Sequence, residues 1–189
     1  MKGTIVKCTQ EMVASRFGEH KWSEVLKRAG LPKWRNFLNF EDVSDSEFAL
    51  LIKSIAHVTG LSENQVMDAH GEYWSTIYAP RVYKRYFEKA HTARELLLQL
   101  DTIHWEMTRS MESARPPNFT YEWQNDSCLV MHYHSPRGLV MLMAGLVRGV
   151  GKYYNENLTV KVVGNKVFVI FPSDAEPDQS THSRSVARH

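Results

Sequence analysis

Two consecutive prolines, Pro116 and Pro117, separate two hydrophobic patterns in this chain. Before them, apolar residues recur mostly three or four positions apart, as they do on the buried face of a helix. Directly after them, Phe119, Tyr121 and Trp123 alternate with polar residues, which is typical of a strand with one buried face. Because proline cannot continue a helix, the chain must leave the preceding helix in an extended form. The sequence therefore predicts helices first, and then a mixture of strands and helices.

Apolar residues at helical spacing predict short helices before the prolines, at 4–16, 22–29, 44–55, 62–79, 83–87 and 94–115. Ser44 is placed to cap the third of them, with Glu47 completing a capping box. Ser62 begins the fourth, and Pro80 is expected to interrupt it.

The segment 34–40 is rich in aromatic residues but has no period. It is predicted to be a loop held against the first two helices. Trp22 and Trp34 are expected to be core anchors of this amino-terminal part.

The second part of the chain predicts a small antiparallel sheet and one central helix. The expected elements are a strand at 119–123, a turn at 124–126, a strand from 129 to Pro136, a helix at 138–154, and a hairpin of strands 158–162 and 167–171 joined by Gly164-Asn165. The polar residues 173–189 have no apolar period and are predicted to be a mobile tail. The fold class is therefore α+β: an amino-terminal helical lobe, and a carboxy-terminal lobe in which a four-stranded antiparallel sheet packs on helices.

Composition and charge exclude several classes of protein. The 189 residues are enough for one domain, or for two small lobes that share a core. With 23 basic and 21 acidic residues the formal net charge is +2, so binding to nucleic acid is not expected. Cys8 and Cys128 are too few for a disulfide scaffold. No apolar run is long enough for a signal peptide or a membrane span, so a cytoplasmic protein without a membrane partner is expected.

The helix before the prolines presents a histidine from its apolar face. Leu100, His104, Met107 and Met111 are spaced so that they share one side of the helix. A neutral imidazole in apolar surroundings is a natural axial ligand for a metal cofactor. A core histidine bonded to a backbone carbonyl would give the same pattern, and on this helix alone that alternative is open.

A second set of candidate residues lies at the end of the second strand. Tyr133, Ser135 and Arg137 are two residues apart, so an extended backbone would point all three to one side. Two hydroxyl groups and a guanidinium can bind carboxylates or phosphate, although a solvated strand end is the structural alternative. His132 and His134 would face the other way. Such a pair can bind zinc, but no cysteine or carboxylate lies at ligand spacing.

The two sets together favour haem. One offers a neutral nitrogen ligand in an apolar pocket, and the other offers donors for two acidic groups. A haem is an apolar disc with iron at its centre and two propionates at its edge, and walls rich in glycine, methionine and aromatic residues suit its flat faces. The histidines His57, His70 and His91 lie at polar or helix-terminal positions and receive no role.

With these residues, the chain resembles the heme-nitric oxide/oxygen-binding (H-NOX) domain family, which includes stand-alone bacterial domains and the haem domain of animal soluble guanylate cyclase. Three motifs carry the resemblance: the MKGTIV start, His104 followed by Pro116-Pro117, and Tyr133-x-Ser135-x-Arg137. It covers residues 1–172 as a single haem domain, with an amino-terminal helical subdomain at 1–60 and a haem-ligating subdomain at 61–172. Haem b would be buried between them.

The resemblance implies roles for individual residues. His104 would be the proximal ligand of the haem iron. Tyr133, Ser135 and Arg137 would bind the propionates, and Pro117 would press on the porphyrin. The remaining haem contacts would come from Ile5, Met107 and Leu146, and the distal gas pocket would be formed by Trp74, Tyr78 and Leu142.

The resemblance also implies a gas sensor rather than an enzyme. Family members that hold oxygen stably place a tyrosine five residues after the motif arginine, where this chain has Leu142, which carries no hydrogen-bond donor. The expected ligands are nitric oxide and carbon monoxide, with oxygen bound weakly or not at all. The alternative source of a donor for oxygen is Tyr73, Trp74 or Tyr78. Nitric oxide would weaken the bond from iron to His104 and shift the lobes, and a histidine kinase or a diguanylate cyclase would receive the signal. The alternatives are a haem protein that stores, transports or detoxifies gas, an enzyme with a metal at the His-x-His pair, and a plain interaction module.

Overall fold

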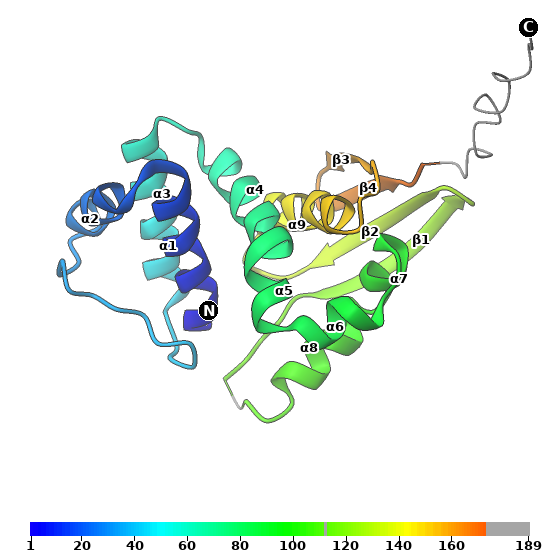
Figure 1. Ribbon diagram of the computed structural model, residues 1–189, viewed down its shortest axis with the longest axis horizontal. Coiled ribbons are helices and arrows are strands. Elements are labelled where there is room, and N and C mark those ends of the chain that lie inside the picture. The colour runs from blue at the N-terminus through cyan, green and yellow to red at the C-terminus, as the bar shows by residue number, and fades with distance from the viewer. Residues whose placement is uncertain (112, 173–189) are drawn as a thin grey trace, which may run out of the picture.

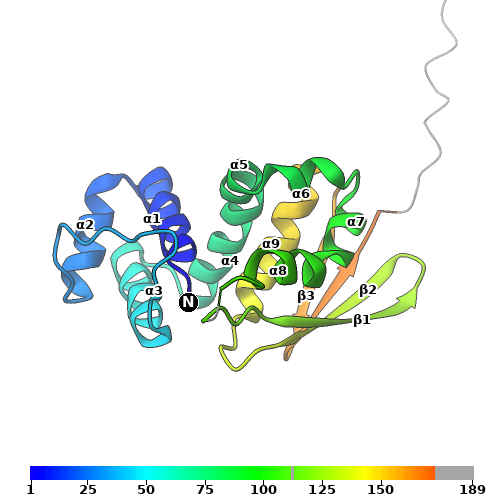
Figure 2. The same cartoon turned by 90° about the horizontal axis from the view of Figure 1, so that it is seen from below.

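The computed structural model describes residues 1–111 and 113–172, so the predicted tail at 173–189 lies outside the described residues. The helices and strands form two lobes that lie side by side (Figure 1). The amino-terminal lobe consists of α1 (Gly3–Phe17), α2 (Glu19–Arg28) and α3 (Asp45–Thr59). From it α4 (Glu63–Tyr73) leads to the second lobe, and the amino terminus lies near the boundary between the two (Figure 2).

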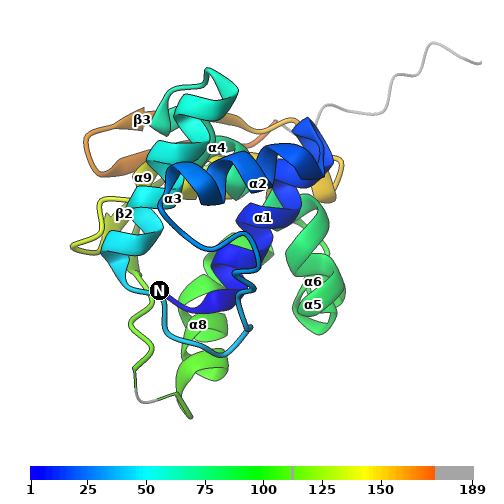
Figure 3. The same ribbon diagram turned by 90° about the vertical axis from the view of Figure 1, so that its left-hand side faces the viewer.

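The amino-terminal lobe has an apolar core of its own, and its three helices lie in front of the second lobe when seen from that side (Figure 3). In the segment 34–40, Phe37 is fully buried, and its ring packs edge-on against Trp22 with the ring centroids 6.5 Å apart. Trp34 is 82% exposed, so the prediction that it anchors the core is wrong. A segment without a period gives no indication of which aromatic side chain turns inward.

Two serines cap helices as predicted. Ser44 Oγ accepts a hydrogen bond from the Glu47 N–H at 3.0 Å. Ser62 Oγ accepts one from the Gln65 N–H at 3.2 Å, and the Gln65 side chain accepts one from the Ser62 N–H at 2.8 Å. The complete capping box therefore belongs to Ser62, while the Glu47 carboxylate lies 3.7 Å from Arg35 Nε.

The helix that begins with α4 does not stop at Pro80. A π-helix, η1 (Trp74–Tyr78), follows α4 and is continued by α5 (Ala79–Val82). Pro80 stands in the first turn of α5, directly after the π-helix, where a residue without an N–H is tolerated. The chain leaves the helical conformation only at Tyr83 (φ −121°, ψ 34°), so the predicted interruption at Pro80 is wrong.

Three short helices follow: α6 (Lys84–Lys89), α7 (Ala93–Leu98) and α8 (Leu100–Thr108). The prediction of one helix over 94–115 is therefore wrong, because the helix breaks at Gln99 and ends well before the prolines. Met111 lies outside it. Apolar spacing does not reveal the break, because the apolar residues keep a four-residue spacing across it. His104 lies on α8, as the sequence predicts.

The carboxy-terminal lobe contains one antiparallel sheet with the strand order β1-β2-β4-β3. The strands are β1 (Asn118–Asn125), β2 (Cys128–His134), β3 (Thr159–Val163) and β4 (Lys166–Ile170). Leu129 and Met131 of β2 are fully buried in the core of this lobe. The four strands on helices confirm the predicted α+β class. However, β2 ends at His134 and not at Pro136 as predicted, because proline has no N–H to donate to a neighbouring strand. Arg137 therefore lies in a turn after the strand.

The helix α9 (Val140–Tyr153) packs on the sheet and crosses α4 at close range. A Cβ atom on Gly145 would collide with the carbonyl oxygen of Asp68, and one on Gly71 would collide with that of Leu142. Glycine at both positions therefore lets the two helix backbones touch. Within residues 1–111 and 113–172, neither α9 nor any other helix is long and apolar enough to cross a membrane.

Candidate functional site

A cavity of about 370 Å³ lies between the two lobes, and most of its wall is apolar. The amino-terminal lobe contributes to the wall Met1, Lys2, Thr4, Ile5, Asn39, Phe40 and Asp42. The carboxy-terminal lobe contributes, among others, His70, Trp74, Ser75, Tyr83, Phe87, Leu100, Ile103, His104, Met107, Arg115, Pro117, Tyr133, Arg137, Leu142, Leu146 and Val150.

Most of the residues that the sequence predicts for the site line this cavity. They are Ile5, Trp74, His104, Met107, Pro117, Tyr133, Arg137, Leu142 and Leu146. Tyr78 lies behind the wall, where its buried hydroxyl shares a hydrogen bond with Thr4 Oγ1 at 3.1 Å. Ser135 also lies outside the lining, and its Oγ accepts a hydrogen bond from the backbone N–H of Arg137 at 3.4 Å. The fold thus brings the two sequence motifs to one cavity, although Tyr78 and Ser135 do not line it.

His104 is presented to the cavity by α8. Asp101, one turn earlier, accepts a hydrogen bond from the Phe119 N–H at 3.1 Å and so fixes α8 against β1. Burial lowers the pKa of His104, and the Asp101 charge and the nearby Pro117 carbonyl offset this only in part. The imidazole is therefore neutral at pH 7. Its Nδ1 is completely buried, and its contact with the Pro117 carbonyl falls short of full hydrogen-bond geometry.

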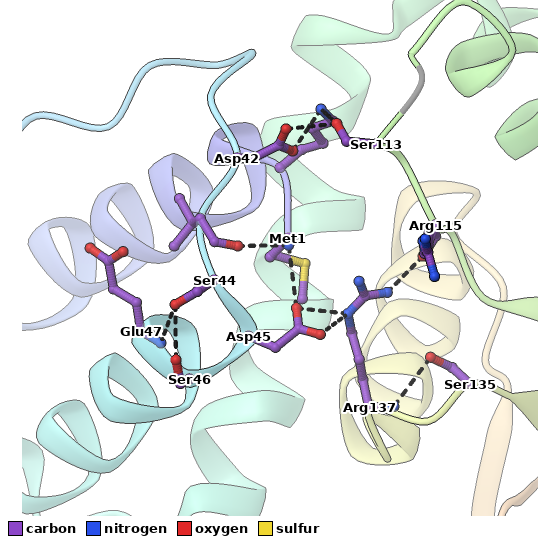
Figure 4. Close-up of polar contacts among 12 residues, drawn as sticks. Met1, Asp42, Ser44, Asp45, Ser46, Glu47, Ser113, Arg115, Ser135 and Arg137 are labelled. Carbon is purple, nitrogen blue, oxygen red and sulfur yellow. Dashed lines mark hydrogen bonds and ion pairs between the residues drawn. The ribbon is translucent and has the colours of Figure 1, made fainter.

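Arg137 lies at the edge of the cavity and connects the two lobes (Figure 4). Its Nε is 2.9 Å and 3.0 Å from the carboxylate oxygens of Asp45, and its Nη1 donates to the Arg115 carbonyl at 2.6 Å. Asp45 also accepts a hydrogen bond from the α-amino group of Met1 at 3.3 Å. The hydrogen bond from Arg137 is the main reason why the pKa of Asp45 is lowered. A guanidinium has five N–H donors, so donors are left for a further carboxylate.

A second polar contact also joins the lobes (Figure 4). Lys2 Nζ lies 2.7 Å from Asp42 Oδ1 and donates to Ser113 Oγ at 2.7 Å. Ser113 Oγ donates in turn to Asp42 Oδ2 at 2.6 Å. Hydrogen bonds from Lys2 and then Ser113 lower the pKa of Asp42. Because Ser113 follows α8 in the chain, this contact holds the exit of the His104 helix against the amino-terminal lobe.

The side chains of β2 leave the strand on alternate faces. Tyr133 is buried and lines the cavity. The rings of His132 and His134 stack with their centroids 6.3 Å apart, and their Nε2 atoms lie 3.2 Å from Glu122 and 2.9 Å from Thr120 respectively. In the part of the chain that the structure describes, no group of three His, Cys, Asp or Glu side chains could hold a metal ion.

Sequence reasoning misses two buried polar residues of the cavity wall, His70 and Ser75. His70 Nδ1 lies 2.9 Å from Thr9 Oγ1, and burial lowers the pKa of the imidazole to about 4. Ser75 Oγ is completely buried and has no hydrogen bond to any described residue. His70 stands one helical turn before Trp74, and this spacing is the signal that could have placed it on the same helix face.

Comparison with known proteins agrees with this arrangement. A family model described as "Haem-NO-binding" matches residues 2–162. The chain belongs to this family. Soluble guanylate cyclase gcy-32 of Caenorhabditis elegans is 25% identical to this H-NOX chain over 169 residues, which cover 87% of the chain and 25% of the cyclase. The chain thus spans about a quarter of the length of this relative, and the likeness concerns one domain of it.

Solved structures show that the fold is the H-NOX fold. An H-NOX protein from S. oneidensis in the Fe(II) state superimposes with a TM-score of 0.82 at 20% identity, over 93% of this chain and 98% of that one. The I5F mutant of T. tengcongensis H-NOX superimposes with a TM-score of 0.80 at 23% identity, over 90% and 97% of the two chains.

The residues of this H-NOX domain fit a haem. The cavity is mostly apolar, and the neutral imidazole of His104 faces it with Nδ1 covered, so Nε2 is the nitrogen available to a metal. Arg137 stands at the edge with spare donors for an acidic group. The apolar wall would suit the flat faces of the haem, His104 its metal, and Arg137 its acidic edge.

Proposed function

We propose that this H-NOX domain holds haem b and senses nitric oxide. One observation carries the proposal: a single cavity between the lobes is lined by His104 of α8, by Tyr133 of β2, by Arg137 in the turn after β2, and by Ile5 of α1. A haem supplies ferrous iron that binds diatomic gases. The chain supplies the groups that hold the cofactor, choose the gas and transmit the change.

Each part of the cofactor would have a partner in the cavity. His104 would bind the iron through Nε2, and burial favours this because a metal ligand must be deprotonated. Tyr133 and Arg137 would bind the propionates. Ser135 would support Arg137 through its backbone N–H and not touch the cofactor itself. Packing on the flat faces would come from Ile5, Met107, Pro117 and Leu146.

Leu142 would make the pocket selective for nitric oxide and carbon monoxide. It lines the cavity together with Trp74 and offers no hydrogen-bond donor. The hydroxyl of Tyr78, which lies behind the wall, is engaged in a hydrogen bond with Thr4. Oxygen becomes polarised when it binds and needs a donor, whereas nitric oxide binds ferrous haem strongly without one, so oxygen should bind weakly or not at all.

The signal would pass through the contacts between the lobes. Release of His104 would let α8 move, and the segment after α8 is tied to the amino-terminal lobe through Ser113. The two lobes would thereby change their relative position, as a switch between two conformational states requires. The receiver would be a histidine kinase or a diguanylate cyclase. The guanylate cyclase relative supports such coupling, because it is a longer protein in which the matched part is one domain.

Absorption spectra of the reduced protein test the proposal. The protein should show a haem band that changes with nitric oxide and stays unchanged in air. His104→Gly should weaken haem binding by more than about tenfold and be rescued by added imidazole, because the metal ligand is lost. His91→Gly, at an exposed histidine, is the matched control and should keep the pigment. A protein that stays colourless when supplied with hemin, or a His104→Gly variant with an unchanged spectrum, would contradict the proposal.

Two further measurements address selectivity and signalling. Leu142→Tyr should move the protein towards oxygen binding, whereas Leu142→Phe, which adds the ring without the hydroxyl, should not. Nitric oxide should change the activity of a kinase or cyclase that co-purifies with the domain. A haem-loaded protein that leaves its partner unaffected would instead be a store or carrier of gas.

A further inference from the structure

A hydrogen-bonded pair of buried residues, His70 and Thr9, joins α4 to α1 beside the cavity. Both side chains are shielded from solvent, and His70 lines the cavity. The ring of Trp74 stacks on that of His70 with the centroids 6.4 Å apart and the planes at 15°. Phe48 meets the same ring edge-on at 6.3 Å. The imidazole is therefore held in one position.

The hydrogen bonds of Thr9 determine which nitrogen of His70 carries the proton. Thr9 Oγ1 donates its only hydrogen to the Ile5 carbonyl oxygen at 3.0 Å, because a carbonyl oxygen can only accept. The same hydroxyl oxygen lies 2.9 Å from His70 Nδ1, and both bonds of Thr9 can form at the same time only when Nδ1 is the donor in this one. A neutral imidazole has one N–H, which leaves Nε2 with a lone pair and no hydrogen. Burial keeps the ring neutral by lowering the pKa of His70 to about 4.

The lone pair on Nε2 is accessible from the cavity. His70 lines the cavity while Nδ1 is engaged with α1, and no described residue forms a hydrogen bond to Nε2. Three atoms of the described side chains are sealed off without a partner: Trp22 Nε1, Ser75 Oγ and His104 Nδ1. His70 Nε2 is not among them, so it keeps accessible surface, and on this buried residue that surface belongs to the cavity.

We propose that His70, fixed by Thr9 as a hydrogen-bond acceptor towards the cavity, selects against oxygen. This role rests on the proposed function. A gas that takes up negative charge on binding is repelled by a lone pair, and oxygen is such a gas, whereas nitric oxide and carbon monoxide stay nearly neutral. The cavity would thus disfavour oxygen in two ways: His70 would repel it, and Leu142 offers it no hydrogen-bond donor.

Thr9→Val tests this role, and the chain offers a matched control. In Thr9→Val, Nδ1 loses its acceptor, so the proton should move to Nε2 and turn His70 into a donor towards the gas. Oxygen affinity should then rise about tenfold, and the stretching frequency of bound carbon monoxide should fall. Thr76 also donates its hydroxyl hydrogen to the carbonyl four residues earlier, that of Glu72 at 2.8 Å, but it does not line the cavity. Thr76→Val should therefore leave both quantities unchanged.

Two other measurements do not depend on how well Thr9→Val folds. Nitrogen NMR of the carbon monoxide complex should show Nδ1 of His70 protonated and Nε2 unprotonated in the wild type. His70→Gln, which offers an amide donor at the same place, should raise oxygen affinity as Thr9→Val does. A wild-type proton on Nε2 would overturn the proposal. The proposal would also be overturned if Thr9→Val and His70→Gln proteins held haem but had the same oxygen affinity as Thr76→Val. A chain that takes up no haem would contradict the proposed function itself.

Discussion

At the scale of single residues, burial keeps two imidazoles of the cavity neutral. His104 has a buried Nδ1 near the Pro117 carbonyl, and His70 is bonded to Thr9. His104 could be predicted because its place on an apolar stripe is visible within one helix. His70 could not, because its partner lies 61 residues away and the bond exists only once α1 packs on α4.

Burial of His70 should make the protein less stable in acid. The pKa of His70 is about 4 in the folded protein against an ordinary value of 6.5, so the unfolded chain takes up a proton at a higher pH than the folded one. The free energy of unfolding should be highest above about pH 6.5 and fall as the pH goes from about 6.5 to about 4, by about 3 kcal/mol in total. Urea unfolding at a series of pH values measures this.

His70→Asn is the matching variant for that experiment. An asparagine amide can still bond to Thr9 but cannot be protonated, so this variant should lose less stability across the same pH range. An equally steep loss in both proteins would show that another group is responsible.

At the scale of helices and strands, elements with a local sequence signal could be predicted, whereas interruptions within the helices could not. The strands lie where the apolar residues alternate, because each strand has one buried face, and the serine caps depend on residues only three positions apart. The break at Gln99 leaves the apolar spacing intact, and no residue type within Trp74–Tyr78 predicts the π-helix η1. The turn that carries Arg137 is stabilised by Asp45 of the other lobe, which is a tertiary contact.

Gly145→Ala should strongly destabilise the crossing of α4 and α9. The new methyl group would collide with the Asp68 carbonyl oxygen, and the backbone of either helix can move only by disturbing the core. We expect a loss of about 3 kcal/mol in the free energy of unfolding, measured by urea titration. Lys152→Ala, at an exposed position of the same helix, removes only the ion pair with Glu72 of α4 and should cost no more than about 1 kcal/mol. Similar losses in the two variants would contradict the close-contact explanation.

At the scale of the whole molecule, two separate apolar cores are connected by α4, by the cavity and by polar contacts that include the Arg137–Asp45 and Lys2–Asp42 ion pairs (Figures 1 and 4). Exposed ion pairs contribute little to stability, so these contacts are suited to fixing the relative position of the lobes rather than to holding the fold together.

Asp45→Asn should loosen the boundary between the lobes without unfolding the protein. The Asp45 side chain is 55% exposed, so solvent screening limits the loss in free energy of unfolding to less than about 1 kcal/mol. Backbone amides near the amino terminus and at the start of α3 should nevertheless exchange their hydrogens about fivefold faster, which mass spectrometry can follow. Glu24→Gln, which removes an exposed pair within α2, is the control and should leave these amides unaffected. A global loss of stability with unchanged local exchange would contradict this view.

The π-helix η1 has a consequence for how such pockets diverge. A π-turn arises where an α-helix accommodates one extra residue. Deletion of a single residue within Trp74–Tyr78 would therefore restore a regular helix and rotate all following residues by about 100° around its axis. Ala79 and Val82, which line the cavity, would be replaced there by their neighbours on the helix. The loss or gain of one codon at this point would thus change the shape of the cavity without any amino-acid replacement.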